Sequence, residues 1–372
     1  MLCTEASSVD FRGQTDDLAV RERESVMGSI GEVVPDKINS LPVIDFSRYT
    51  AGSAEERLAV SRELVQAFKS VGFVYLLNHG IPNDMVHEAF DWMSKFFNLP
   101  QKELCAPSLL RPKAVPESRS YKLRGYSPVG GEKISQSIDA DEVSKLRQVE
   151  DVRDMFDFGA DIGVPSIREP NMWPSEEVLP GFKDFSMKFF WTCNGAGLDV
   201  LRAIALGLDL PENFFADAHS DNDHLIRYHH YPQVDRKSLV EGTKARVGAH
   251  SDYGTMTLLF QDKVGGLEVE HPTKKGQFDP APYLEGAAIV NIGDFLQRWT
   301  NDVLKSTLHR VVAPQVDDGT GFTRERRSIP FFMQADRHTT VQCAPGLEGE
   351  TGVKYPPITA MEHLYQRTAN SY

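Results

Sequence analysis

Residues 255–269 read TMTLLFQDKVGGLEV, two short apolar runs separated by a turn that contains Gly265 and Gly266. Short apolar or alternating runs between turn residues are typical of β-strands. Runs of the same kind recur on both sides of this stretch, at 225–231, 287–292, 307–312 and 328–333. Short strands in such regular succession indicate an all-β sandwich or barrel.

The half of the chain before this region has a more helical pattern. Ser53 and Glu56 form a capping-box pattern, and the apolar residues behind them recur at near-helical spacing, which predicts a helix. Further expected elements are strands at 41–46 and 72–77 and helices at 85–97, across most of 180–208, and at 360–367.

These patterns predict one folded domain behind a loose leader. Residues 1–38 are polar, charged and weakly periodic, which is typical of a segment without a packed core. Residues 39–372 are then expected to form a single domain. Its parts are a mostly helical portion at 39–210, a β core at 225–345 and a helical segment at 356–372.

Composition and charge exclude some classes of function. Of the 372 residues, 41% are hydrophobic and 25% charged, as in ordinary globular proteins. The net charge of −13 argues against a general nucleic-acid binder, which needs a basic face. No apolar run is long enough to span a bilayer, and the start, MLCTEASSVDF, shows no secretory pattern. We therefore expect a cytoplasmic protein with no membrane or nucleic-acid partner; the oligomeric state is not readable from these features.

The sharpest chemical signal is the triplet His250-Ser251-Asp252. In an extended chain, residues two apart point to the same side and lie about 6.6 Å apart, so an imidazole and a carboxylate can reach one metal ion. A third ligand must come from another strand, and His309 lies in the strand-like run LHRVV at 308–312. Two histidines and one carboxylate that leave coordination positions open are the ligand set of non-heme Fe(II) oxygenases. An HxD pair alone is common by chance, and a lone histidine is more often packed than ligating, so the interpretation depends on the whole set.

Arg326 and Ser328 form a second pair at the same spacing. On a strand both face one way, while Arg327 faces the other. A guanidinium is a planar fork that matches a carboxylate with two parallel hydrogen bonds, and a neighbouring hydroxyl can bind the carboxylate as well. The alternative is a surface arginine in the basic run at 324–327.

From about Leu41 to its end, the chain resembles the Fe(II)/2-oxoglutarate oxygenase family, in the branch of isopenicillin N synthase. The motifs that carry the resemblance stand in the order of the family: LPVIDF at 41–46, GFVYLLNHGIP at 72–82, FFNLP at 96–100, DMFDFG at 154–159, LPGF at 179–182, LIRYHHYP at 225–232, AHSDYGTMTLLFQDKVGGLEV at 249–269, IVNIGDFLQRWTN at 289–301, LHRVV at 308–312 and RRSIPFF at 326–332.

The resemblance implies a double-stranded β-helix (jelly roll), an all-β core with flanking helices. It implies Fe(II) held by His250, Asp252 and His309, and the cosubstrates 2-oxoglutarate and O2. It further implies that Arg326 and Ser328 bind the far carboxylate of 2-oxoglutarate. The expected reaction is hydroxylation, desaturation or ring closure of a small organic molecule, in specialised metabolism.

Tyr231 matches a family tyrosine that donates a hydrogen bond to 2-oxoglutarate, within a motif that ends Tyr-Tyr-Pro. Here the motif reads His229-His230-Tyr231-Pro232, so two histidines replace the more usual residues. The pocket beside the cosubstrate is therefore expected to differ from that of the plant members.

Two weaker hypotheses concern residues around the site. Arg227 is placed to approach it from the same motif. The irregular stretch at 105–150 is a candidate lid, with Arg124, Tyr126 and Lys133 as contacts. The remaining histidines have no partner at useful spacing and are not expected to be ligands: His79, His87, His219, His224, His271, His338 and His363.

Two alternatives stay open at this point. One is an oxidase like isopenicillin N synthase, which uses iron and O2 without 2-oxoglutarate and binds its substrate's carboxylate with the same Arg-x-Ser pair. The other is a non-catalytic β-sandwich that binds a metal or ligand. The complete His-Asp-His set argues against the second, and the tyrosine donor at Tyr231 favours 2-oxoglutarate over the first.

Overall fold

The computed structural model describes residues 36–112, 124–131, 149–162, 169–313 and 319–368. Within these ranges, no helix combines the length and the apolar character needed to cross a membrane.

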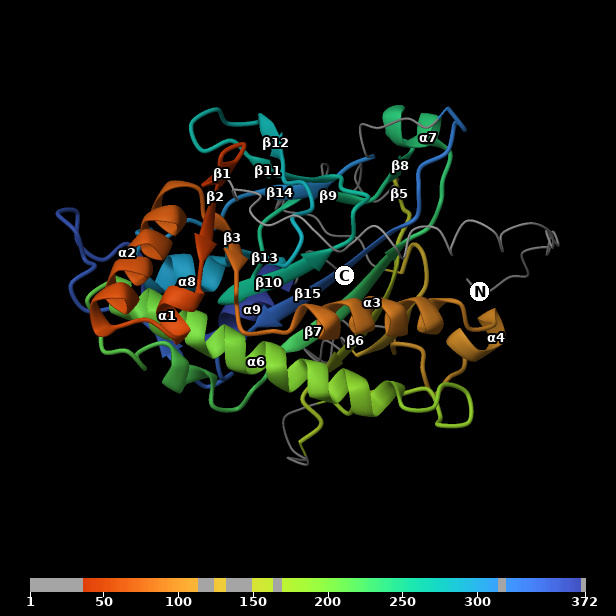
Figure 1. Cartoon of the computed structure of the whole chain (residues 1–372), viewed down its shortest axis with the longest axis horizontal. Coiled ribbons are helices and arrows are strands. Elements are labelled where there is room, and N and C mark those ends of the chain that lie inside the picture. Colours follow the sequence, from red (N-terminus) through yellow and green to blue (C-terminus); the bar gives the residue numbers. More distant parts are fainter. Residues whose placement is uncertain (1–35, 113–123, 132–148, 163–168, 314–318, 369–372) are drawn as a thin grey trace, which may run out of the picture.

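Two β-sheets form the centre of the described structure (Figure 1). The large sheet has nine strands in the order β1-β2-β3-β13-β10-β15-β7-β6-β4, and the small sheet has four in the order β12-β11-β14-β9. The strands of the large sheet are β1 (Lys37–Ile38), β2 (Leu41–Asp45), β3 (Phe73–Leu77), β13 (Ala287–Ile292), β10 (Met256–Gln261), β15 (Arg326–Met333), β7 (Leu225–Tyr231), β6 (Asp154–Gly159) and β4 (Gly125–Ser127). Those of the small sheet are β12 (Phe278–Pro280), β11 (Leu267–Glu270), β14 (His309–Val311) and β9 (Val247–His250). Two minor pairs complete the strands: β5 (Glu150–Asp151) with β8 (Lys244–Ala245), and β16 (Thr340–Val341) with β17 (Ile358–Thr359).

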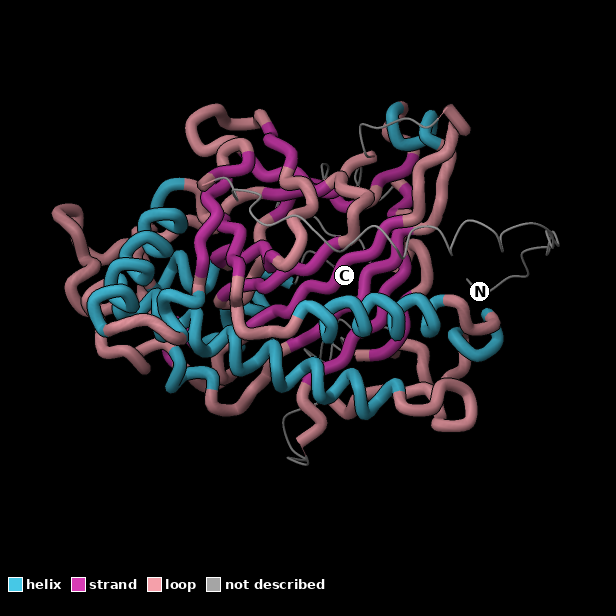
Figure 2. The backbone as a smooth tube through the Cα atoms, in the orientation of Figure 1, coloured by secondary structure: helices cyan, strands magenta, loops and turns pink. Residues whose placement is uncertain are grey.

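The longer helices gather on the face of the large sheet that points away from the small sheet, as Figure 2 shows in cyan and magenta. They are α2 (Ala54–Ser70), α3 (Asn83–Phe97) and α6 (Phe182–Gly207). The shorter helices are α1 (Ser47–Thr50), α4 (Gln101–Leu104), α7 (Arg236–Val240), α8 (Asp294–Trp299) and α9 (Ala360–Thr368), with a 3-10 turn at Ala216–His219. The capping box predicted at Ser53 and Glu56 is present, and α2 begins directly behind it.

Two hydrophobic cores follow from this layering. The larger core lies between the helices and the large sheet, and includes Phe68, Phe189 and Phe331, all without exposed surface. The smaller core includes Val269 and Ile289, from the small and the large sheet respectively. The predicted double-stranded β-helix with flanking helices is confirmed.

The predicted strands at 41–46 and 72–77 are present as β2 and β3, which extend one side of the large sheet. The structure adds β6 and β4 on the other side, so the portion at 39–210 contributes to the sheet as well as covering it. The pairing of β2 with β3 is parallel, which needs the intervening helix α2 as a crossover.

The lid hypothesis fails for the two of its residues that the structure describes. Tyr126 lies in β4, is 2% exposed and packs against Phe96 and Phe97, so it belongs to the core. Arg124 is buried and donates to the carbonyl of Ala160 and to the side chain of Asn171. Lys133 lies outside the described residues.

Gly207, at the end of α6, marks a close approach of two helices and gives a first testable prediction. A Cβ atom there would lie 2.3 Å from the backbone oxygen of Ser61 in α2. Gly207→Ala is therefore expected to lower the free energy of unfolding by about 1–3 kcal/mol, because the backbone must shift to relieve the overlap. Gly195→Ala in the same helix is the matched control, since a Cβ there meets nothing within 4 Å. That variant is expected to be neutral or more stable by up to about 1 kcal/mol, from helix propensity alone. Urea denaturation of both variants measures the contrast, and equal effects would contradict this account.

Candidate active site

A cavity lies where the large and small sheets face each other. β7 and β15 of the large sheet contribute Tyr231 and Arg326 to its lining, and β9 and β14 of the small sheet contribute His250 and His309. Leu364 of the C-terminal helix α9 lines it as well. The cavity therefore collects side chains from segments that are distant in sequence.

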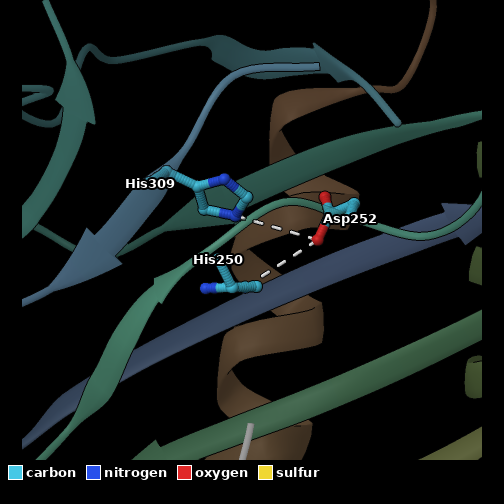
Figure 3. Close-up of side chains that lie close together, drawn as sticks. All are labelled: His250, Asp252 and His309. Atoms are coloured by element: carbon cyan, nitrogen blue, oxygen red, sulfur yellow. Dashed lines mark ion pairs between the residues drawn. The ribbon is translucent and has the colours of Figure 1, made fainter. Parts of the chain in front are cut away.

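His250, Asp252 and His309 converge in this cavity (Figure 3). One ligand atom from each residue lies within 4.8 Å of the other two. Asp252 Oδ1 is 3.9 Å from His250 Nε2 and 3.7 Å from His309 Nε2. In the described part of the chain, no other group of three or more His, Cys, Asp or Glu residues comes together in this way.

Strand pairing explains how the two histidines meet. His250 ends β9, and His309 begins β14 directly opposite it in the antiparallel register, which brings their rings to 4.2 Å between centroids. Each ring directs Nδ1 toward a backbone carbonyl: His250 to Gly248 at 2.9 Å and His309 to Thr307 at 3.3 Å. A carbonyl can only accept, so Nδ1 carries the proton and Nε2 is left with a lone pair for a metal ion.

Asp252 lies just beyond the end of β9 and is fixed by the other sheet. Thr257 of β10 donates its hydroxyl to Oδ2 at 2.6 Å, and Asn291 of β13 donates its amide to the same oxygen at 2.8 Å. Oδ1 then faces the two histidines. Burial raises the pKa of Asp252, but His309, His250 and the two hydrogen bonds outweigh burial and hold that pKa below its usual value.

The electrostatics of the cluster fit a cation. Burial, followed by the neighbouring His309, lowers the pKa of His250 to about 3, so this imidazole is neutral at ordinary pH. The cluster thus offers two imidazole nitrogens and one carboxylate oxygen, a donor set that suits Fe(II) and leaves coordination positions for other ligands.

Thr257 provides a test of how Asp252 is positioned. Thr257→Val keeps the shape of the side chain but removes the hydroxyl, so Oδ2 loses one of its two donors. Loss of such a supporting hydrogen bond is expected to weaken Fe(II) binding by roughly tenfold to a hundredfold. Anaerobic metal titration measures the change. Thr300→Val is the control, because the Thr300 hydroxyl donates to Leu296 and Gln297 carbonyls away from the cavity; equal metal affinity for both variants would contradict this role.

Arg326, Ser328 and Tyr231 form a second group at the same cavity. Arg326 is 1% exposed, and its Nη1 donates to the Ser328 hydroxyl at 3.0 Å. Its guanidinium lies over the Tyr231 ring, 4.9 Å from the centroid. β15 and β7 bring this about, because Arg326 pairs with Tyr231 in the register. Arg327 points the other way, toward Glu325, as alternation along the strand predicts.

The other predicted residues divide into those at the cavity and those away from it. Arg227 lines the cavity and holds Asp157 through Nε at 2.7 Å and Nη2 at 2.8 Å. His229 lines it too, whereas His230 is tied to Asp154 at 2.6 Å. The remaining described histidines do not belong to the cluster: His79, His87, His219, His224, His271, His338 and His363.

Several residues that line the cavity or hold the His250–Asp252–His309 cluster in place were not predicted from the sequence. Arg153 lines the cavity but carries no motif that points to a site. Thr257 and Asn291 are ordinary strand residues until the sheets place them beside Asp252. The approach of α9 is also a tertiary feature: Arg367 donates to the hydroxyl of Ser251 at 3.3 Å and pairs with Asp294 at 2.6 Å.

A jelly roll with two histidines and a carboxylate in such a cavity defines a mononuclear non-heme iron oxygenase as the class of protein. The family model of the 2OG-Fe(II) oxygenase superfamily matches residues 222–335, and the model described as "non-haem dioxygenase in morphine synthesis N-terminal" matches residues 41–176. The chain belongs to the 2OG-Fe(II) oxygenase superfamily and is a 2-oxoglutarate-dependent dioxygenase.

Individual relatives agree with this assignment. A 2-oxoglutarate-Fe(II) type oxidoreductase of Metarhizium rileyi is 37% identical over 88% of this chain and 90% of its own length. A proline hydroxylase of Petromyces alliaceus is 36% identical over 90% of this chain and 100% of its own. Among solved structures, a full-length Neurospora crassa protein in complex with alpha-KG and thymine superimposes with a TM-score of 0.77. It is 35% identical, and the match covers 88% of this chain and 96% of the Neurospora crassa chain. The isopenicillin N synthase-like branch is not singled out by these relatives and stays a prediction.

Proposed function

We propose that His250, Asp252 and His309 hold Fe(II) in this enzyme, and that Arg326, Ser328 and Tyr231 bind 2-oxoglutarate. The enzyme then hydroxylates, desaturates or cyclises a small organic molecule in specialised metabolism. The first assignment is supported by the converging ligand atoms, and the second by the buried guanidinium that faces the same cavity.

The observation that carries the proposal is the set of partners around Arg326. Its hydrogen bonds go to the Gly265 carbonyl at 2.9 Å, the Ser328 hydroxyl and the Gln261 side chain at 3.3 Å. All of these hydrogen-bond partners are neutral. The carboxylate of Asp262 is near enough to interact electrostatically with Arg326, but its two oxygens accept from the backbone N–H groups of Arg327 and Val264. A buried guanidinium is stabilised by an anionic partner, and 2-oxoglutarate brings a carboxylate of the right shape for a bidentate contact.

The roles of this chain's own groups follow from their positions. Arg326 and Ser328 would orient the distal carboxylate. The Tyr231 hydroxyl, which has no hydrogen-bond partner among the described residues, would donate to the same cosubstrate. Leu259, Leu267 and Val311 line the cavity with apolar surface and would exclude water. When bound, Fe(II) with 2-oxoglutarate supplies the activation of O2, with succinate and carbon dioxide as coproducts.

The proposed substrate is a small molecule. This is supported by the Neurospora crassa structures in complex with thymine or 5-formyluracil and by the relative named a proline hydroxylase. The cytoplasmic location, the lack of a nucleic-acid or membrane partner, and the division into a leader at 1–38 and one domain at 39–372 stay predictions.

Oxygen uptake and succinate formation test the proposal directly. Purified enzyme with Fe(II), ascorbate and 2-oxoglutarate is expected to consume O2 and release succinate, and to lose both activities when iron or 2-oxoglutarate is omitted. O2 consumption that needs iron but ignores 2-oxoglutarate would favour an oxidase in which Arg326 binds a substrate carboxylate. No iron-dependent consumption with any substrate would favour a binding protein.

A further inference from the structure

Two guanidinium groups lie over the ring of Tyr231. That of Arg326 is 4.9 Å from the ring centroid, and that of Arg246 is 5.6 Å from it. Arg326 belongs to β15 of the large sheet, whereas Arg246 lies between β8 and β9. Both arginines are 1% exposed. Two positive charges are therefore held close together, out of water, at the end of the cavity that is proposed for 2-oxoglutarate.

The protein compensates the charge of Arg246 poorly. Its Nη2 donates to the backbone carbonyl of Arg324 at 2.8 Å, and its Nε and Nη1 are buried without a hydrogen-bond partner in the described part of the chain. Arg227 differs in this respect, because Asp157 binds it through two hydrogen bonds. A buried charge with so few partners is unfavourable unless another charge compensates it.

The charges around Tyr231 do not balance within the described structure. Burial, followed by Arg326, lowers the pKa of Arg246 to about 10, so this guanidinium is still charged at neutral pH. The carboxylate of Asp262 is near enough to interact with both arginines, but its oxygens accept from backbone N–H groups. Two guanidinium groups thus lie near one carboxylate, which leaves an excess of one positive charge.

We propose that Arg246 is a second positioning residue for 2-oxoglutarate, whose charge stabilises the distal carboxylate bound by Arg326 and so strengthens the preference for a dicarboxylic cosubstrate. Arg246 is not among the residues that line the cavity, so it acts from behind Tyr231 without touching the cosubstrate. Buried charges several ångströms apart interact strongly, because little water screens them. This inference rests on the proposed function, because it assumes that the distal carboxylate lies at Arg326.

The alternative is that Arg246 serves only as a structural tie. Its hydrogen bond to Arg324 joins the segment before β9 to the segment before β15, two residues from Arg326. A tie of this kind would affect the binding of any keto acid equally, because it does not depend on the charge of the ligand. Keto acids that differ only in the distal carboxylate therefore separate the two roles.

The test is an anaerobic binding measurement on the Fe(II) enzyme. Calorimetry gives the affinities for 2-oxoglutarate and for 2-oxovalerate, which has the same carbon chain and keto-acid end but no distal carboxylate. Wild type is expected to prefer 2-oxoglutarate. Arg246→Gln keeps a hydrogen-bond donor but loses the charge, and is expected to reduce this preference about tenfold through weaker binding of 2-oxoglutarate alone. Arg246→Lys keeps the charge and is expected to retain most of the preference.

Two further variants show whether the effect belongs to this position. Arg298→Gln is the matched control, because Arg298 also lies over a tyrosine ring, that of Tyr355, and donates to a backbone carbonyl, that of Pro356, but does not line the cavity. It is expected to leave both affinities unchanged. Arg246→Met replaces the buried charge with an apolar chain. Thermal unfolding is expected to show this variant at least as stable as wild type without 2-oxoglutarate, and less stabilised than wild type when 2-oxoglutarate is added.

The outcomes distinguish failure of this inference from failure of the proposed function. If wild type prefers 2-oxoglutarate and Arg246→Gln keeps that preference, the inference is overturned and the proposed function stands. Equal losses of affinity for both keto acids in Arg246→Gln, or an Arg246→Met variant that is less stable than wild type, would make Arg246 a structural tie and also overturn the inference. If wild type binds both keto acids equally, no distal carboxylate is recognised, and the proposed function itself fails.

Discussion

Asp252→Ala is expected to abolish turnover and to weaken Fe(II) binding by at least about a hundredfold, the upper range for loss of a supporting group. Asp252 supplies the only carboxylate oxygen of the cluster, so the variant leaves two imidazoles and no negative charge to hold a divalent cation. It also leaves the Thr257 hydroxyl and the Asn291 amide without their acceptor, at about 1–3 kcal/mol for each buried donor. Metal affinity must therefore be measured under conditions where circular dichroism shows the variant folded.

Two further variants separate the effect of the lost charge on Fe(II) affinity from the effect of lower folding stability. Asp252→Asn keeps the shape of the side chain but not its charge, and is expected to lose most of the metal affinity as well. Asp336→Ala is the control for stability, because Asp336 is also buried but accepts hydrogen bonds from Ser220 and Asp221 away from the cavity. That variant is expected to unfold at a lower temperature and to keep its Fe(II) affinity. Unchanged Fe(II) affinity in Asp252→Ala would refute the ligand assignment.

Arg326→Ala is expected to raise the 2-oxoglutarate concentration for half-maximal succinate formation by roughly tenfold to a hundredfold. A charge-assisted hydrogen bond in a buried site is worth about 1.5–3 kcal/mol, and about 1.4 kcal/mol corresponds to each factor of ten. Arg326→Lys keeps the charge but loses the two-point geometry, so its effect is expected to be smaller. Fe(II) affinity is expected to survive in both variants, since Arg326 is outside the metal cluster.

The next residue along β15 provides the control for this experiment. Arg327 carries the same side chain, but it pairs with Glu325 and faces away from the cavity. Arg327→Ala is expected to leave the 2-oxoglutarate requirement unchanged. If Arg326→Ala shows the same requirement as Arg327→Ala, then Arg326 does not bind the cosubstrate.

The convergence of His250, Asp252 and His309 was predictable from sequence because much of its signal is local. His250 and Asp252 are two residues apart, and His309 lies in a run with a clear strand pattern. The alternation that separates Arg326 from Arg327 is local in the same way. In the fold, the short strands after Leu225 and the capping box of α2 were predictable for the same reason, because their patterns involve residues close together in sequence.

What the sequence did not predict depends on pairing between distant segments. β4 lies in the stretch at 105–150 that was interpreted as irregular, and no strand was predicted for β6, yet both join the large sheet through β7, and this pairing buries Tyr126. Arg153 has no motif of its own and reaches the cavity because it directly precedes β6. Likewise, no sequence pattern around Thr257 or Asn291 links them to Asp252. They donate to its carboxylate because β10 and β13 are paired in the sheet.

The three proposed metal ligands come from different layers of the barrel, and this has a mechanical consequence. His250 and His309 belong to the small sheet, whereas Asp252 is fastened to β10 and β13 of the large sheet. An ion bound to all three is a cross-link between the two layers of the barrel. Separation of the two sheets then requires release of the ion, so opening fluctuations of the barrel are coupled to loss of the metal. Amide hydrogens of β9 and β14 should accordingly exchange more slowly with metal present, while those of the helix-covered face respond less.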